Sequence, residues 1–157
     1  MYKNLWPDEL KILVIDPDQD SLNMIRFCLE PAGFRVIRTH KPHEGVNLAR
    51  QEQPDLLILD LTMAAFDGFE LLQHIRADHS LEMIPTIAIS ARAKTIDQQR
   101  ILQLCLPEPE EIEAFMGKPV NPALLLSTVK RVLSKHKDYL LHKNRRSEKF
   151  REELAAI

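Results

Sequence analysis

The chain has 157 residues, 45% of them hydrophobic and 28% charged, and its formal net charge at pH 7 is −2. This length suits one domain with a full core and an appended element. No apolar run approaches the roughly 20 residues of a membrane span, and residues 1–8 lack the apolar core of a signal peptide. We therefore expect a cytoplasmic protein without membrane contact.

The charges are distributed unevenly along the chain. Residues 135–157 hold more basic than acidic side chains, whereas the preceding part holds more acidic ones. Cys28 and Cys105 lie far apart without zinc-type spacing, so we expect two reduced core thiols. The histidines show no ligand spacing with acids and are expected at the surface: His40, His43, His74, His79, His136 and His142.

In the first half of the chain, short apolar runs alternate with segments of helical spacing. Residues 10–15 predict a strand that ends at Asp16, and Asp20 or Ser21 is expected to cap a helix that ends near residues 31–33. Residues 34–39 predict a second strand and residues 42–53 a second helix. A third strand over residues 54–60 ends at Asp60.

The same alternation continues in the second half. A helix is expected from Phe69 to residue 78, a strand over residues 85–90, a helix over 95–104 and an exposed acidic loop over 106–111. Residues 114–116 predict a fifth strand, after which Asn121 caps a last helix with Pro122 at its first position. Five such alternations predict an α/β fold with a doubly wound, five-stranded parallel sheet.

Polar side chains stand where four of the predicted strands end. These residues are Asp16, Asp60, Ser90 and Lys118. The carboxyl ends of parallel strands share one edge, so the four side chains are expected to converge. The two acids can hold a divalent cation such as Mg²⁺, and Asp60 can act as a nucleophile toward a phosphoryl group whose charge Lys118 neutralises.

The order and spacing of these motifs resemble the receiver domain of bacterial two-component response regulators, a flavodoxin-like (βα)5 fold. The resemblance covers roughly residues 11–133, and its carriers are residues 12–16, 57–60, 66–72, 84–93 and 115–119. It implies that Asp60 is phosphorylated by a partner histidine kinase or phosphotransfer protein, with Lys118 binding the phosphoryl group. It also implies a switch of partner interactions through Ser90 and Phe115, and a peptide bond before Pro119 that is often cis in this family.

The resemblance also implies a Mg²⁺ site. Its ligands would be Asp16, Asp60 and the main-chain carbonyl of Thr62. The family usually has a second acid where this chain has Pro17, so metal binding is expected to be weak, with Asp18 as a further candidate ligand. Ala64 and Ala65 replace a usual Pro-Gly, and residues 104–112 depart from the family pattern where partners commonly dock.

Two alternatives differ in class from a phosphoacceptor. The first is a receiver that works without phosphorylation, as a protein-interaction module. The second is a haloacid-dehalogenase-like phosphohydrolase, with Asp16 as nucleophile and Asp18 as acid or base; it leaves Asp60 unexplained, and no acidic pair follows Lys118. The favoured interpretation is a signalling receiver rather than an enzyme, acting on a downstream output protein.

The chain continues beyond the expected receiver domain, residues 10–134, which residues 1–9 precede. Residues 135–157 lack Pro and Gly and carry an imperfect heptad-like seam, so we expect a helical extension. The hypothesis is that the last helix runs on beyond the domain and pairs, in coiled-coil fashion, with another chain (as in a homodimer) or with a downstream element. A single amphipathic helix or the start of a linker is about equally compatible. Interleaved acids argue against direct nucleic-acid binding by its basic residues.

Overall fold

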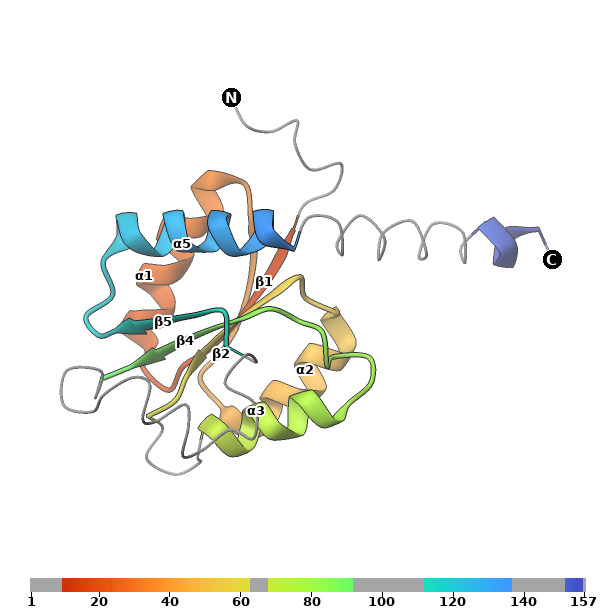
Figure 1. Cartoon of the computed structure of the whole chain (residues 1–157), viewed down its shortest axis with the longest axis horizontal. Helices are drawn as coiled ribbons and strands as arrows, with labels where there is room; N and C mark the ends of the chain where they lie inside the picture. The colour runs from red at the N-terminus through yellow and green to blue at the C-terminus, as the bar shows by residue number, and fades with distance from the viewer. Residues whose placement is uncertain (1–9, 63–67, 92–111, 137–151, 157) are drawn as a thin grey trace.

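The computed structural model describes residues 10–62, 68–91, 112–136 and 152–156 (Figure 1). A parallel sheet of five strands lies at its centre, in the order β2-β1-β3-β4-β5. The strands are β1 (Lys11–Ile15), β2 (Arg35–Thr39), β3 (Leu56–Asp60), β4 (Thr86–Ser90) and β5 (Ala114–Gly117). The predicted fold class is confirmed.

Helices cover both faces of this sheet. The described ones are α1 (Gln19–Leu29), α2 (Gly45–Glu52), α3 (Gly68–Ala77) and α5 (Pro122–Lys135). Helices α1 and α5 lie on one face, and α2 and α3 lie on the other (Figure 1). Short 3-10 turns at Glu30–Ala32 and Pro42–Glu44 follow α1 and precede α2.

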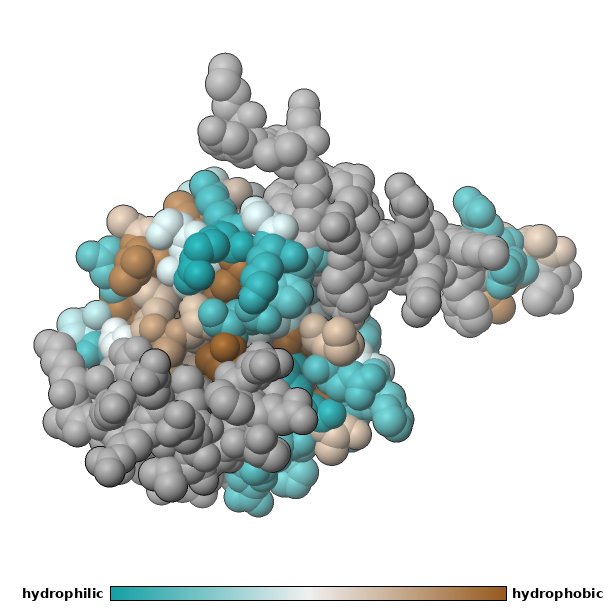
Figure 2. Space-filling model, viewed as in Figure 1, coloured by the Kyte–Doolittle hydropathy of each residue, from teal (hydrophilic) through white to brown (hydrophobic). Residues whose placement is uncertain are grey.

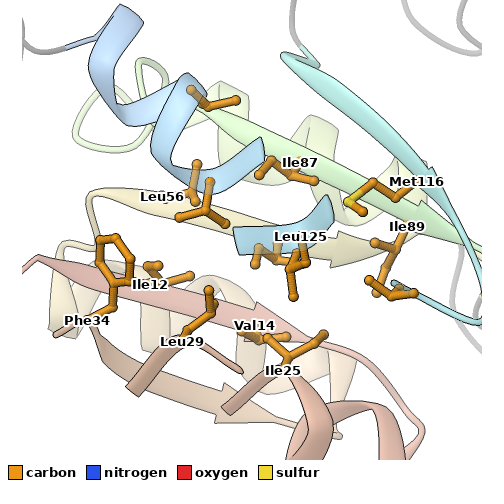
Figure 3. Packing of buried hydrophobic residues seen from close by; sticks show 14 of the residues in the cluster. Ile12, Val14, Ile25, Leu29, Phe34, Leu56, Ile87, Ile89, Met116 and Leu125 are labelled. Atoms are coloured by element: carbon orange, nitrogen blue, oxygen red, sulfur yellow. The ribbon is translucent and has the colours of Figure 1, made fainter. Parts of the chain in front are cut away.

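The core has two layers because successive strand residues point to opposite faces of the sheet. On the α1/α5 face, strand residues such as Ile12, Leu56 and Ile87 pack with Leu29 of α1 and Leu125 of α5 (Figure 3). On the other face, their neighbours in sequence pack against α2 and α3; among them are Leu13, Leu57 and Ala88. The inner strands β1, β3 and β4 are therefore buried on both sides, which explains their nearly continuous apolar sequences.

Two predicted helix starts are wrong. Asp18, not Asp20 or Ser21, is the N-cap of α1, and its carboxylate accepts hydrogen bonds from the Asp20 N–H at 3.0 Å and the Ser21 hydroxyl at 3.1 Å. In place of a helix from Pro42, the chain forms the 3-10 turn first and α2 begins at Gly45. At the last helix the prediction is confirmed, because the Asn121 side chain accepts from the Leu124 N–H at 3.0 Å.

Several predictions fall outside the described residues. They concern the helix over 95–104, the acidic loop over 106–111, Cys105, His142, and the passage of α5 into the C-terminal extension through residues 137–151. On the face seen in Figure 2, hydrophilic residues are interspersed with smaller hydrophobic areas. None of the described helices has the length and apolar character needed to cross a membrane.

Candidate functional site

The parallel register brings the predicted polar residues to one edge of the sheet. Asp16 directly follows β1, Asp60 ends the adjacent β3, and Ser90 ends β4. Lys118 follows β5, and its main-chain N–H donates to the Ser90 carbonyl at 2.9 Å. The bond between Lys118 and Pro119 is a cis peptide.

The Lys118 ammonium lies between the two carboxylates. Its Nζ is 2.8 Å from Oδ2 of Asp60 and 2.8 Å from Oδ2 of Asp16, and it donates a hydrogen bond to Oδ1 of Asp16 at 3.0 Å. Asp16 Oδ1 also accepts from the Asp18 N–H at 2.8 Å. One cation thus bridges two acids that come from strands far apart in the sequence.

Burial of this cluster shifts the pKa values of its ionisable side chains. Asp16 is fully buried, and Asp60 is 2% exposed. Loss of water raises the pKa of Asp16, and the hydrogen bond from Lys118 only partly opposes this effect. For Lys118, burial favours the neutral amine, but hydrogen bonds to Asp16 and Asp60 outweigh it and raise the pKa of the ammonium. Two buried acids share one lysine, so the site carries an excess of negative charge that favours a further cation.

Thr62 donates two hydrogen bonds to Oδ1 of Asp60, the carboxylate oxygen that Lys118 does not contact. The Thr62 N–H donates to Asp60 Oδ1 at 2.7 Å, and the Thr62 hydroxyl donates to the same oxygen at 2.8 Å. The hydroxyl in turn accepts from the main-chain N–H of Ala91 at 3.2 Å. The family resemblance implied only a role for the main-chain carbonyl of Thr62. A threonine two residues after a strand-end acid was the only available signal for this hydroxyl contact.

Gly68 allows α3 to begin directly against the end of β3. A Cβ at Gly68 would lie 2.5 Å from the Asp60 carbonyl oxygen and 2.6 Å from Cα of Leu61. Both are backbone atoms, which cannot move aside as the tip of a side chain can. Only glycine therefore fits here without displacing the backbone that carries Asp60.

The remaining predicted residues lie around this cluster. Ser90 is buried at 1% exposure, and Phe115 is half-buried against the α2/α3 layer of the core. Pro17 is exposed. Asp18 uses both carboxylate oxygens to cap α1, and none of the ion pairs between described residues includes it. Metal ligation by Asp18 and switching through Ser90 and Phe115 stay predictions.

The side chains present fit a cation with few protein ligands. Within the described ranges, no three His, Cys, Asp or Glu side chains gather into a metal-binding group. Asp16 Oδ2 is nevertheless buried without a hydrogen bond, its contact with Lys118 being an ion pair. Mg²⁺ commonly keeps several waters and uses one or two carboxylates, which Asp16 and Asp60 can supply.

One histidine departs from the predicted surface location. His136, the residue after α5, is half-buried, and its Nε2 lies 2.8 Å from Oε1 of Glu113 just before β5. Lys135 Nζ lies 2.9 Å from the other oxygen of Glu113. Glu113 precedes Lys135 by 22 residues and His136 by 23 residues. These separations match neither a helical nor a strand period, so the sequence pattern did not predict the contacts.

Comparisons with known proteins agree with this geometry. The family model of the response regulator receiver domain matches residues 12–130. The polar-differentiation response regulator DivK of Brucella ovis is 29% identical over 122 residues, which cover 78% of this chain and 94% of that protein. DivK of Brucella abortus matches to the same extent.

Solved structures of response regulators share the fold of this chain. A response regulator from Desulfuromonas acetoxidans superposes with a TM-score of 0.68 at 26% identity, covering 80% of this chain and 97% of that one. The chemotaxis response regulator CheY4 of Vibrio cholerae gives a TM-score of 0.69 at 24% identity, covering 80% of this chain and 100% of that one. At that identity the likeness to CheY4 concerns the fold alone.

Proposed function

We propose that this protein, which belongs to the family of response regulator receiver domains, accepts a phosphoryl group on Asp60 from a histidine kinase or a phosphotransfer protein. Receiver domains are signalling modules that interact with such kinases and with output partners. The observation that carries the proposal is the ammonium of Lys118, 2.8 Å from the buried Asp60 carboxylate. An acid held beside a cation at the end of a strand is suited to receive an anionic group.

The transfer moves one phosphoryl group between two nucleophiles. A lone pair of an Asp60 carboxylate oxygen forms the new O–P bond, while the P–N bond of the phosphohistidine breaks. The electron pair of that bond stays on the imidazole nitrogen, which leaves as the free histidine side chain. Lys118 remains beside the product and offsets the charge that the phosphoryl oxygens add.

A divalent cation assists such transfers in receiver domains. Here Asp16 and Asp60 would hold Mg²⁺, with the predicted Thr62 carbonyl as a further ligand. When bound, the cation supplies positive charge toward the phosphoryl oxygens. Pro17 offers no carboxylate to it, so we expect a weak site.

The signal would leave the site through β4 and β5. The buried Ser90 and the half-buried Phe115 stand on these adjacent strands, where Ser90 pairs with Gly117 and Phe115 with Ala88. We expect the acyl phosphate to shift an equilibrium between two conformations of these side chains, and so to change the surface offered to an output protein. A cytoplasmic location is part of this proposal.

Intact mass after incubation with Mg²⁺ and acetyl phosphate tests the proposal. The wild-type chain should gain one phosphoryl group, and Asp60→Asn should gain none. Asp78→Asn is a matched control, because Asp78 is a carboxylate that pairs with Arg50 away from the site. No adduct on the wild type, or an adduct that survives Asp60→Asn, would contradict the proposal.

A receiver that works without phosphorylation is the second candidate. Pro17, which stands where the family usually has an acid, favours it, because a weakly held cation would assist phosphoryl transfer less. Wild-type protein without an adduct would select this candidate. We do not propose the phosphohydrolase, since Asp18 caps α1 and the family match includes Asp60.

A further inference from the structure

We infer that Glu113 is a positioning residue that ends α5 through its contact with His136, and so decides whether α5 and the C-terminal extension can form one continuous helix. The inference goes beyond the proposed function. Glu113 precedes β5, at the edge of the sheet opposite the one that carries Asp60, and its contact with His136 does not involve a phosphoryl group.

The sequence gives α5 no local reason to end where it does. The helix ends at Lys135, with His136 as its C-cap. Helices commonly end at Gly or Asn, with Pro shortly beyond, but residues 135–157 contain neither Gly nor Pro, and their first Asn is at position 144. The backbone of His136 nevertheless leaves the helix, with φ −97° and ψ 12°, whereas ψ is about −42° in a regular α-helix. The end of α5 therefore needs a cause outside its own sequence.

Glu113 supplies such a cause. Its main-chain N–H donates to the Thr86 carbonyl at 2.8 Å, so the sheet anchors this residue. One of its carboxylate oxygens lies 2.9 Å from Lys135 Nζ, and the other lies 2.8 Å from His136 Nε2. Adjacent residues of a helix point about 100° apart, so two consecutive side chains that meet one carboxylate favour a departure from helical geometry. The anchored acid thus stabilises the non-helical backbone of His136.

Of the two contacts, the one with His136 is the stronger. The Lys135 side chain is 70% exposed, so solvent screens its ion pair. The side chains of Glu113 and His136 are 15% and 23% exposed, and their contact is screened less. An ionised carboxylate can only accept, so the imidazole donates from Nε2. A hydrogen bond to a charged group changes an equilibrium by a factor of about ten or more, which is enough to move the end of a helix.

This contact matters for the apolar seam that leads from α5 into residues 135–157. Seam positions share one face only along a continuous helix. While Glu113 holds His136, the helical phase set by the core residues Val129 and Leu133 stops at His136. Once the contact is broken, the same phase would continue into the extension. Glu113 thereby controls whether the seam of the extension has a fixed orientation relative to the domain.

Amide hydrogen exchange of the full chain, followed by NMR, tests the inference. In a continuous helix the amides of residues 137–139 would donate to the carbonyls of Leu133, Ser134 and Lys135. Glu113→Ala removes the carboxylate and keeps the main-chain N–H, and it should slow exchange of these three amides about tenfold. Glu82→Ala, at a glutamate whose partner His79 is almost fully exposed, should leave them unchanged.

Two further variants keep the test decisive. Glu113→Gln preserves the shape of the side chain in case Glu113→Ala disturbs β5. It should slow the same amides about threefold, because a hydrogen bond to a neutral acceptor is roughly half as strong. Lys135→Ala leaves the His136 contact in place and should change their exchange by less than about twofold.

Unchanged or faster exchange of residues 137–139 in both Glu113 variants would overturn the inference. So would a slowing in Lys135→Ala as large as that in Glu113→Ala, because His136 would then not be the residue through which Glu113 acts. Slowing in Glu82→Ala would likewise contradict a specific role of Glu113. All of these measurements are made without a phosphodonor, so failure of the proposed function is seen separately, as the missing phosphoryl adduct in the mass experiment.

Discussion

Pro17 is the residue at which we expect a substitution to change Mg²⁺ affinity most. It follows the buried Asp16 and precedes Asp18, whose oxygens are used in the cap of α1. Pro17→Asp would add a third hard oxygen donor to Asp16 and Asp60. Because affinity for Mg²⁺ rises with the number of charged ligands, we expect about tenfold tighter binding by calorimetry.

The control for this substitution is Pro17→Asn, which removes the ring of proline but adds no charge. It should leave Mg²⁺ affinity close to that of the wild type. If the Asp and Asn variants bind Mg²⁺ equally, position 17 does not contribute a charged ligand in this chain, and weak binding must have another cause.

Gly68 offers a direct test of how tightly the backbone of Asp60 is enclosed. A methyl group at this position would overlap the Asp60 carbonyl oxygen and Cα of Leu61. Overpacking against backbone typically costs about 1 to 3 kcal/mol, so Gly68→Ala should lower the free energy of unfolding by that amount. It should also slow formation of the phosphoryl adduct, since Asp60 would shift.

Gly45→Ala is the matched control, as Gly45 begins α2 just as Gly68 begins α3. Its added methyl would meet Cδ1 of Ile15, the far end of a flexible side chain. Alanine also favours a helix over glycine, so the free energy of unfolding should change little. Equal destabilisation by both variants would show that Gly68 matters only as a helical glycine.

At the scale of elements, the strands could be predicted well and the helix starts less well. A strand buried on both faces needs an unbroken apolar sequence, and a polar residue marks where it reaches the sheet edge, as at Asp16 and Asp60. The start of α1 offers Asp18, Asp20 and Ser21, all of which are good caps. Which one serves depends on the direction in which the chain leaves β1, and composition does not encode that direction.

The end of α5 is fixed to the start of β5 by one acid. The Glu113 side chain is 15% exposed and contacts both Lys135 and His136. Burial alone would raise its pKa, but the hydrogen bonds from Lys135 and His136 outweigh burial and lower the pKa of Glu113 below its ordinary 4.5. Glu113 is thus more acidic in the folded chain than in the unfolded one.

The sign of the pH dependence follows from this lowered pKa. A carboxylate with a depressed pKa stabilises the fold above pH 4.5 and loses this contribution as the pH falls through its folded value. Glu113→Gln should lower the free energy of unfolding by about 1 kcal/mol at pH 7, and by progressively less below pH 4.5. Urea unfolding at a series of pH values measures the difference.

Glu82→Gln provides the comparison for that experiment. Glu82 is half-exposed, and its partner His79 is almost fully exposed, so solvent screens the pair. This variant should match the wild type at every pH. A gap between Glu113→Gln and the wild type that stays constant down to pH 3 would mean that the charge of Glu113 is not what stabilises the end of α5.

For the whole molecule, the sequence predicted which residues meet at the site but not the contacts that link distant segments around it. Convergence of Asp16, Asp60, Ser90 and Lys118 follows from topology alone, since parallel strands end at a common edge. The contact of Thr62 with Ala91, like that of Glu113 with His136, depends on how two loops or ends are packed. Contacts of this kind follow no helical or strand repeat in the sequence, so only the three-dimensional structure reveals them.

Homodimerisation through residues 135–157 is the prediction at this largest scale. The heptad-like seam that suggests it begins within α5, at positions such as Leu126, Val129 and Leu133, which already pack in the domain core. These early seam positions are therefore not free to pair with a partner chain. We expect the full chain to be a dimer by light scattering, and a chain that stops after His136 to be a monomer.

The stop is placed after His136 rather than after the expected domain boundary at residue 134, because Lys135 and His136 both contact Glu113. A shorter chain would lose these contacts, and a change in mass could then reflect local unfolding. Leu154→Glu in the full chain supplies a second test without truncation, since Leu154 is a seam position that is 56% exposed. A charge at an apolar seam position opposes pairing. If the full chain, the shortened chain and Leu154→Glu are all monomeric, the extension does not join two copies.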